Sequence, residues 1–337
     1  MQTFCLLALV LPLLALPLGA QPRIGAIEIF GAGKVSRDKI QKAIGARPGD
    51  PLPKSKGDVE EALEAIDGVV QARLEAFCCD QGKPVLYVGI LERGANSFTY
   101  RPYPQEEVEL PKEILTAYAD FSAALSRASA EGDLKEDLTA GHSLMQNLPC
   151  RVAQERLIGL AELHFHTIAS VLVNAFEPEQ RSIAAYVLGY GPDKAAVLKE
   201  LLLALQDPDA SVRANATRAT KALAVYAIAH PAENLRVQPT WFVEMLNSVE
   251  LSDRLEASRV LLLFTEKRDA NAIGNIRDRA MPALLEMARW QHLPHALPAY
   301  LLAGRVAGWS DDSLESLWAS GDREKALKDM EKTLKKR

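Results

Sequence analysis

The feature that most constrains the fold of this chain is a helical pattern that recurs in its C-terminal half. In residues 197–223 a leucine-rich stretch is followed by the turn Asp207-Pro208-Asp209 and by a second stretch that opens with Val212-Arg213. Apolar residues recur at helical spacing in both stretches, so each stretch predicts a helix with one buried stripe. Such a helix pair buries its apolar side only by stacking on similar pairs.

Weaker copies of the pattern flank this segment. Three positions recur after 32 residues and again after 41, namely Arg181, Ala184 and Val187, then Arg213, Ala216 and Ala219, then Arg254, Ala257 and Val260. A helix over Arg156–Phe176 would begin the first copy, and Pro282–Met287 with Leu297–Trp309 would form the last. We therefore expect about four helix pairs over residues 151–310, which is enough for a stable stack, with capping helices in residues 311–337.

The pattern resembles the HEAT repeat, in which a leucine-rich helix and an Asp-containing turn precede a second helix that opens with Val-Arg. The resemblance implies an all-α, right-handed superhelical domain. Stacks of this kind present a long concave surface that binds other proteins. Some helical-repeat proteins that this chain resembles are lyases that attach bilin pigments, so an enzyme or enzyme accessory of that type is the alternative interpretation.

Residues 22–94 have the pattern of a small α+β unit. Alternating apolar residues predict a strand in Arg23–Phe30. Ser36 is a candidate N-cap for the helix that follows, and Asp58–Ile66 has the apolar spacing of a second helix. A β-hairpin closes the unit, with strands over Val69–Cys79 and Val85–Leu91. The predicted order is β-α-α-β-β, with two helices packed on three strands.

This order resembles the POTRA domain, a periplasmic module of outer-membrane assembly and secretion proteins. The motifs that carry the resemblance are Ile27-x-Ile29-x-Gly31, Val35-Ser36, Pro48-Gly49-Asp50, Gly68-Val69-Val70 and Leu91-Glu92-Arg93-Gly94. The resemblance implies binding rather than chemistry, because an extended peptide can add to an exposed edge of such a sheet. A unit that only caps the helical domain is the alternative. The single copy argues against a direct role in inserting membrane proteins.

The N-terminal segment has the composition of an export signal. Met1–Ala20 carries no charge, and its apolar stretch is shorter than a membrane-spanning helix requires. It ends in Leu18-Gly19-Ala20, a small-residue site that a signal peptidase can accept. We expect a signal peptide over residues 1–20, no membrane span after its cleavage, and a periplasmic or secreted protein. An uncleaved anchor or a buried N-terminal helix is the alternative.

The cysteines and the net charge narrow the classes further. Cys78, Cys79 and Cys150 would remain after cleavage, and an odd number forms no closed disulfide framework. Burial as small apolar residues is expected, with a bridge from Cys78 or Cys79 to Cys150 as the alternative. The net charge of −5 and the aromatic content of 6% argue against nucleic-acid binding.

Residues 95–150 predict a linker and bridging helices. Pro102 and Pro104 indicate an extended connector, and Pro111 stands at the start of a helix with a buried face. The following Gly141-His142-Ser143 places an imidazole beside a hydroxyl. Sequence neighbours rarely aim at each other and no third orienting group is evident, so we expect no catalysis there.

No metal, cofactor or catalytic site is predicted elsewhere. His164 and His166 would point in different directions on a helix, and His292-x-x-His295 lacks a third ligand. Asp207 and Asp209 precede a helix and are expected to cap it. We therefore expect a non-enzymatic, exported scaffold or adaptor that binds proteins of the cell envelope through a sheet edge and a concave helical surface. A purely structural envelope protein is a further interpretation.

Overall fold

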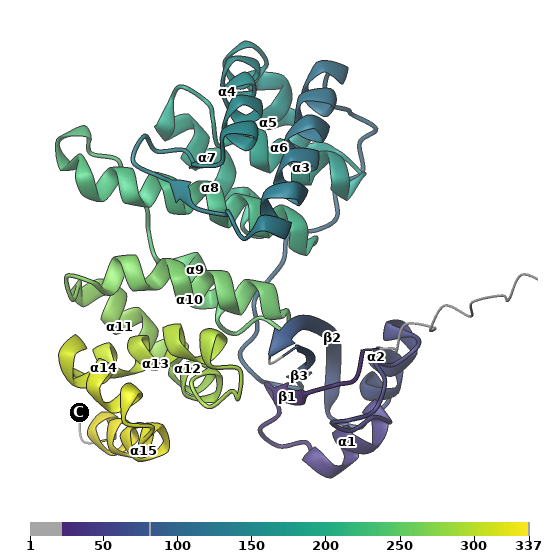
Figure 1. Ribbon diagram of the computed structural model, residues 1–337, viewed down its shortest axis with the longest axis vertical. Helices are drawn as coiled ribbons and strands as arrows, with labels where there is room; N and C mark the ends of the chain where they lie inside the picture. The colour runs from purple at the N-terminus through teal and green to yellow at the C-terminus, as the bar shows by residue number, and fades with distance from the viewer. Residues whose placement is uncertain (1–21, 81, 336–337) are drawn as a thin grey trace, which may run out of the picture.

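The computed structural model describes residues 22–80 and 82–335, and Figure 1 shows a small sheet unit beside a larger helical part. The expected signal peptide over residues 1–20 lies outside the described residues. The chain is mainly helical with one small mixed sheet near the N-terminus, in agreement with the predicted α+β class.

The sheet unit has the predicted order of elements. They are β1 (Ala26–Phe30), α1 (Arg37–Ile44), α2 (Lys56–Glu64), β2 (Val69–Asp80) and β3 (Lys83–Glu92). The strand order is β1-β3-β2, with β1 parallel and β2 antiparallel to the central β3. Side chains alternate along β3, so Leu86, Val88 and Ile90 belong to the core under α1 and α2.

The second face of the sheet is also buried, which corrects the expected two-layer unit. Phe30, Val85 and Tyr87 belong to the core of the helical part rather than to that of α1 and α2. The ring of Trp290 lies 5.6 Å from that of Phe30 and 5.2 Å from that of Tyr87. Apolar residues on both faces of the central strand produce this arrangement, because each face needs its own covering layer.

The helical part begins with a bridge that contains α3 (Lys112–Glu131) and the short hairpin of β4 (Glu136–Asp137) and β5 (Leu144–Met145). The remaining helices are α4 (Leu148–Leu163), α5 (Phe165–Asn174), α6 (Pro178–Leu188), α7 (Lys194–Ala204), α8 (Ala210–Ala229), α9 (Thr240–Met245), α10 (Leu251–Thr265), α11 (Ala270–Arg279), α12 (Met281–Met287), α13 (Leu293–Ala307), α14 (Asp311–Ala319) and α15 (Arg323–Leu334). A 3₁₀ turn spans Pro231–Glu233.

The helices stack in pairs. α5 packs on α6, α7 on α8, α9 on α10 and α12 on α13, and the second helices form a continuous row in the order α6, α8, α10 and α13. The positions that recur in the sequence are buried in this row. They are Ala184, Ala216 and Ala257, each 0% exposed, with Val187, Ala219 and Val260. Small residues at these positions let successive helices approach closely.

The helix expected over Arg156–Phe176 is instead two helices. α4 ends at Leu163 and α5 begins at Phe165, with an angle of 91° between them. Apolar periodicity alone does not reveal this break, because each helix keeps its own apolar stripe. Among the described helices none alone is long and apolar enough to cross a membrane, although α4 and α5 together meet that test as a bent pair.

A ladder of buried arginines connects successive pairs. The guanidinium group of Arg181 donates to both carboxylate oxygens of Asp207 at 2.9 Å. In the next pair Arg213 Nε donates to Asp253 at 2.9 Å. Arg254 occupies the third position, and its Nε donates to the Ser248 carbonyl at 2.6 Å. Each arginine therefore holds the turn before its own helix. Each also reaches a carboxylate of the next pair, since Arg254 lies 3.5 Å from Glu286 of α12.

The ladder changes one expectation for the turn before α8. Asp209 caps α8 as predicted, because its side chain accepts from the backbone N–H groups of Ser211 and Val212. Asp207 does not cap this helix. It is fully buried between Arg181 and Arg101, which a short-range capping rule does not anticipate.

The connector after the sheet unit is pinned along the turns of the stack. Tyr100 donates to or accepts from the Ser248 hydroxyl at 3.1 Å, and the Arg213 guanidinium lies 4.5 Å from its ring centroid. The Arg101 backbone N–H donates to the Gln206 carbonyl at 2.7 Å. Glu106 pairs with the turn between α5 and α6. The connector therefore crosses three successive turns in the direction opposite to the stack.

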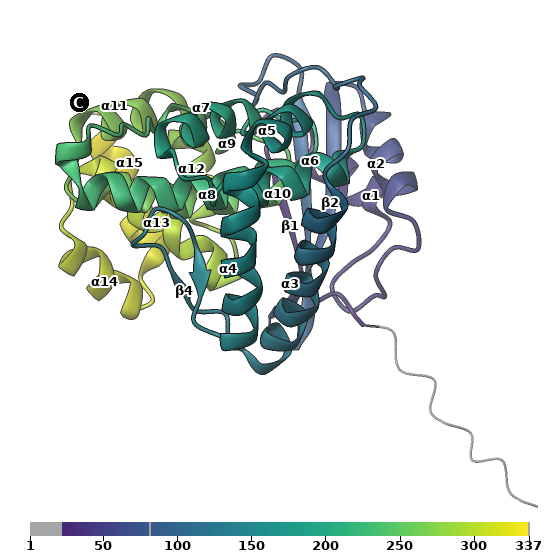
Figure 2. The same ribbon diagram turned by 90° about the horizontal axis from the view of Figure 1, so that it is seen from above.

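The bridge covers the start of the stack. α3 and α4 lie side by side (Figure 2). The rings of Tyr118 and Phe121 on α3 lie 5.3 Å and 4.9 Å from that of Tyr186 on α6. Every residue of α6 from Arg181 onward is buried as a result.

Candidate functional site

The candidate site lies where the sheet unit meets the stack, and several buried polar contacts converge there. The turn before α10 and the turn before α13 pack on the second face of the sheet, the face that carries Phe30, Val85 and Tyr87. Gly89 of β3 allows this close approach, because a Cβ there would lie 2.0 Å from the Val249 carbonyl oxygen. Gly31 has a φ of 78°, and a Cβ would lie 2.1 Å from the Ile90 carbonyl oxygen. Both glycines are therefore required by the geometry of the junction.

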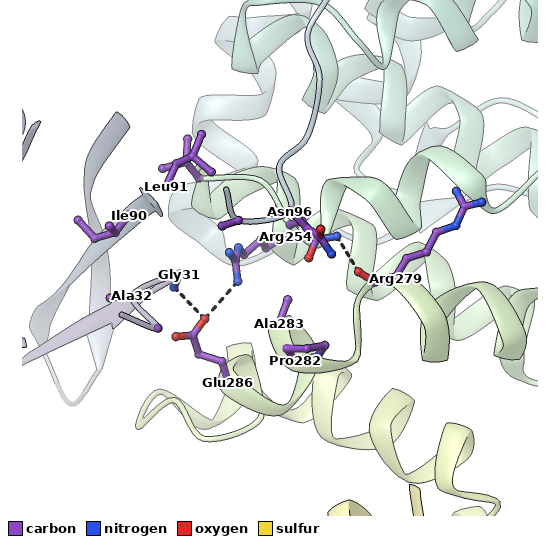
Figure 3. A pocket seen from close by; sticks show the side chains of 14 residues that line it. Gly31, Ala32, Ile90, Leu91, Asn96, Arg254, Arg279, Pro282, Ala283 and Glu286 are labelled. Carbon is purple, nitrogen blue, oxygen red and sulfur yellow. Dashed lines mark hydrogen bonds and ion pairs between the residues drawn. The ribbon is translucent and has the colours of Figure 1, made fainter. Parts of the chain in front are cut away.

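Glu286 of α12 is the central charge of this junction. Its carboxylate accepts from the Gly31 backbone N–H at 2.9 Å and lies 3.5 Å from Arg254 (Figure 3). It also lies 3.9 Å from Arg37. Arg254 stacks on the Phe30 ring, with 4.5 Å between the guanidinium carbon and the ring centroid. Burial lowers the pKa of Arg254 to about 10, so this arginine remains a cation at neutral pH.

Two hollows flank Glu286. The inner cavity, of about 340 Å³, lies between the Gly31–Gly33 loop, Asn96 and the α12 residues Pro282 and Ala283 (Figure 3). At its wall Asn247 donates to the Arg279 carbonyl at 3.1 Å. The outer groove, of about 670 Å³, is lined by residues of α1, α11, α12 and α15 and by residues that closely follow α12 and α15. They are Arg37, Arg277, Met281, Pro282, Leu285, Glu286, Arg289, Glu331, Leu334 and Lys335. The two hollows share Pro282 and Glu286.

A second carboxylate, that of Glu92, fixes the Gly31–Ser36 loop beside this junction. Glu92 at the end of β3 accepts from the Lys34 backbone N–H at 2.8 Å and from that of Val35 at 2.7 Å. Ser36 stands at the N-cap position of α1, but its side chain makes no capping hydrogen bond, which corrects the expectation for this residue. The Leu91-Glu92 motif thus holds the Gly31–Ser36 loop in place from across the sheet.

The long edge strand β2 is partly protected against pairing with another strand. The backbone N–H of Ala72 donates to the Glu64 carboxylate at 3.0 Å, and that of Leu74 donates to the Glu60 carboxylate at 2.7 Å. Both carboxylates come from α2. A partner strand that paired with β2 at these two positions would have to displace them, as is usual for a protected edge.

Along the row α6, α8 and α10, the side chains on one side of the helices become more exposed to solvent from one copy to the next. Tyr186, Arg218 and Arg259 occupy equivalent places in the three copies, at the recurring intervals of 32 and 41 residues. Tyr186 is 4% exposed beneath α3. The side chain of Arg218 is 22% exposed and contacts Glu136 of the bridge, whereas that of Arg259 is 42% exposed. The bridge therefore covers α6, contacts α8, and leaves α10 open.

The triplet Gly141-His142-Ser143 lies in the bridge hairpin, and the structure gives no hydrogen bond between the His142 ring and the Ser143 hydroxyl. Ser143 is 2% exposed, and its hydroxyl has no hydrogen-bond partner in the described part of the chain. The His142 ring packs near that of Tyr190, with 5.7 Å between centroids. Burial and the charge of Lys194 lower the pKa of His142. The backbone carbonyl of Ser143, by contrast, accepts from Tyr190 at 3.0 Å.

The histidines are spread over separate sites. His164 pairs with Glu113, and the ring of His166 lies beside Phe165. His292 and His295 do come together, with 4.3 Å between ring centroids, and His295 Nδ1 is 2.8 Å from the Tyr87 hydroxyl. Within residues 22–80 and 82–335, no three His, Cys, Asp or Glu residues are placed to hold a metal ion.

Two titratable groups lie in the same sheet–stack interface, the buried His295 and the half-buried Glu75. Burial, with His292 as the next cause, lowers the pKa of His295 to about 3. Burial and the nearby Glu250 raise the pKa of Glu75 to about 7. Glu75 accepts from the backbone N–H of Leu251 at 2.8 Å, so a residue of β2 caps the start of α10.

The cysteines do not bridge the two parts of the chain. Cys150 is free and fully buried, in agreement with its expected role as a small apolar residue. Cys78 is disulfide-bonded, so it does not pair with Cys150. The side chain of Cys79 lies outside the described residues.

Comparison with known proteins gives no family. No protein-family model, no curated protein and no solved structure matches this chain.

Proposed function

We propose that this protein is a non-enzymatic, exported scaffold that binds other proteins of the cell envelope. The apolar leader supports export to the periplasm or the outside. The β-α-α-β-β unit supports a POTRA-like module, and the repeated arginine ladder supports a right-handed, HEAT-like stack. In this proposal the sheet unit fixes the geometry of the stack, and the open part of the stack binds the partner.

The observation that carries the proposal is that the chain already binds a helix of its own on this face. α3 packs on α6 through Tyr118 and Phe121, whose rings contact Tyr186, the residue of α6 that is equivalent to Arg259 of α10. On α10 the equivalent positions form an accessible surface of Glu256, Arg259 and the half-buried Leu263. A partner helix with an apolar stripe can pack there as α3 packs on α6.

Strand addition to the sheet is a second candidate mode of binding. β2 is a long edge strand, and the carboxylates from α2 occupy its donors at Ala72 and Leu74 only. The half-exposed Phe77 lies beyond the protected stretch. We place this mode second because the partner must bind next to, or displace, the two carboxylates.

Site-specific crosslinking tests the proposed surface. A photo-crosslinking residue replaces Arg259 in one version of the protein and Lys199, whose side chain on α7 is 80% exposed, in a control version. Crosslinking in the native envelope should join one protein to position 259, and Arg259→Glu should abolish the capture of that protein without lowering the melting temperature. Equal crosslinking from both positions, or capture that survives Arg259→Glu, would overturn the proposal.

A further inference from the structure

We infer that the outer groove is a second binding site, which takes an acidic segment with apolar side chains from a partner protein. The groove lies between the sheet unit and the last helices, away from the open face on α10. The inference therefore goes beyond the scaffold proposal and does not depend on it. Two properties of the groove support it, namely its apolar floor and its unpaired positive charges.

The floor of the groove is apolar. Met281 is 7% exposed, and Pro282 and Leu285 of the same short helix α12 lie beside it. Leu334 near the end of α15 completes the floor and is half-buried. A volume of about 670 Å³ accommodates several side chains, which is more than a single small ion needs.

The rim of the groove is positively charged. The side chains of Arg277 and Lys335 are exposed and make no hydrogen bond or ion pair with any residue that the structure describes. Arg37 is 61% exposed, and its nearest carboxylate is Glu286 at 3.9 Å. Arg277 belongs to α11, Lys335 directly follows α15 and Arg37 belongs to α1, so the three cations surround the floor on different sides.

The two carboxylates in the groove are already engaged. Glu286 is held by the Gly31 backbone N–H and by Arg254. Glu331 pairs with Arg289 at 2.9 Å, and Arg289 also pairs with Glu324 at 3.1 Å. The available charge of the groove is therefore positive, on a chain whose net charge is −5. A local positive site on an acidic protein selects acidic ligands.

The shape of the charge distribution favours a peptide over a nucleic acid. A peptide whose acidic residues flank apolar ones can place its apolar side chains on the floor and its carboxylates beside the separated cations. None of the residues that line the groove is aromatic, so the groove offers no platform on which bases could stack.

The test uses labelled synthetic peptides and the full chain without its signal peptide. One peptide contains glutamate and leucine, a second has serine in place of leucine, and a third has lysine in place of glutamate. Fluorescence anisotropy should show binding of the Glu/Leu peptide that weakens as salt is added, with weaker binding of the Glu/Ser peptide and none of the Lys/Leu peptide. The double variant Arg277→Glu/Lys335→Glu should weaken binding of the Glu/Leu peptide by about tenfold or more.

A matched control separates local from overall charge. Lys54→Glu/Lys199→Glu makes the same change in net charge at two exposed residues outside the groove, and it should leave the affinity within about twofold. Arg259→Glu should also leave the affinity for the Glu/Leu peptide unchanged. This variant therefore tests the scaffold proposal without testing the groove. An equal loss in the control, equal binding of the Lys/Leu peptide, or tighter binding of a single-stranded oligonucleotide would overturn the inference.

Discussion

Buried charge at single residues organises the stack. Arg181 and Arg213 are each 0% exposed, and each donates both to main-chain carbonyls of its own turn and to a carboxylate of the next pair. Removing one member of such a pair leaves the other charge buried without a partner, which is costly. The repeated arginine is therefore better understood as a connector between pairs than as a surface residue.

The substitution Arg213→Met tests this role. It leaves Asp253 buried without its cation, so we expect the free energy of unfolding to fall by about 3–5 kcal/mol in denaturant titrations. Arg151→Met is the control, because Arg151 pairs with Glu155 at the surface and should contribute less than about 1 kcal/mol. Similar small losses for both variants would show that the buried pair is not a structural connector.

Glu75 makes the sheet–stack interface sensitive to pH. Its pKa of about 7 in the folded protein lies above the ordinary value of 4.5, so the folded state holds a proton that the unfolded state has lost between these values. This contribution to stability is complete below pH 4.5 and is lost as the pH rises through 7. Glu75→Gln keeps an acceptor for the Leu251 N–H but does not titrate.

We therefore expect Glu75→Gln to melt at a higher temperature than the wild type at pH 8, by an amount equivalent to about 1–3 kcal/mol, and near the wild-type temperature at pH 5. Thermal melts followed by circular dichroism at the two pH values measure the difference. A difference that is the same at both pH values would contradict the assigned role of Glu75.

At the scale of elements, α2 both covers the sheet and protects its edge. Glu60 and Glu64 lie four residues apart on one side of the helix and reach alternate N–H groups of β2. The double variant Glu60→Ala/Glu64→Ala frees these donors, so we expect it to associate through its sheet edges. Light scattering at increasing protein concentration should show a larger species than for the wild type.

Glu61→Ala is the control for this variant, because Glu61 is an exposed residue of the same helix that does not reach the strand. It should remain in the wild-type assembly state. If the double variant behaves like Glu61→Ala, then the carboxylates do not protect the edge and strand addition needs no displacement of α2.

Elements whose burial depends on near neighbours could be predicted from the sequence. The alternation in β1 and the apolar spacing in α8 are local patterns, so the type and order of these two elements agree with the expectation. The break at His164 and the burial of Asp207 depend on residues far away in the chain. No local pattern contains that information, and the sequence therefore missed both.

The candidate site could not be predicted from the sequence for the same reason. Gly31 belongs to a recognisable motif of the sheet unit, but its partner Glu286 follows 255 residues later. Arg254 recurs at a repeat position, but the repeat does not reveal its contact with Phe30. A charged residue at a repeat position that is otherwise buried was the one available signal that a distant partner exists.

At the scale of the molecule, the first third of the chain folds back along the stack. The sheet unit contacts the turns before α10 and α13, and the connector then crosses the earlier turns until α3 reaches α6. The N-terminal unit is therefore part of the same core as the last helix pairs, which is why its second face is apolar. This arrangement makes the relative position of the two hollows and the open α10 face a property of one packed structure.

Gly89 is the residue on which this close packing depends most directly. In Gly89→Ala the added Cβ would overlap the Val249 carbonyl, so the sheet must move away from the stack. We expect the wild type to unfold in one transition, with tryptophan fluorescence and far-ultraviolet circular dichroism coinciding. In Gly89→Ala the fluorescence transition should come first, because Trp290 lies in the separated interface.

Gly57→Ala is the control, because Gly57 lies in α2 and a Cβ there would meet no atom within 4 Å. It should keep coincident transitions, and its free energy of unfolding should rise by up to about 1 kcal/mol. Coincident transitions at the wild-type temperature in Gly89→Ala would mean that the sheet unit and the stack are not coupled through this contact.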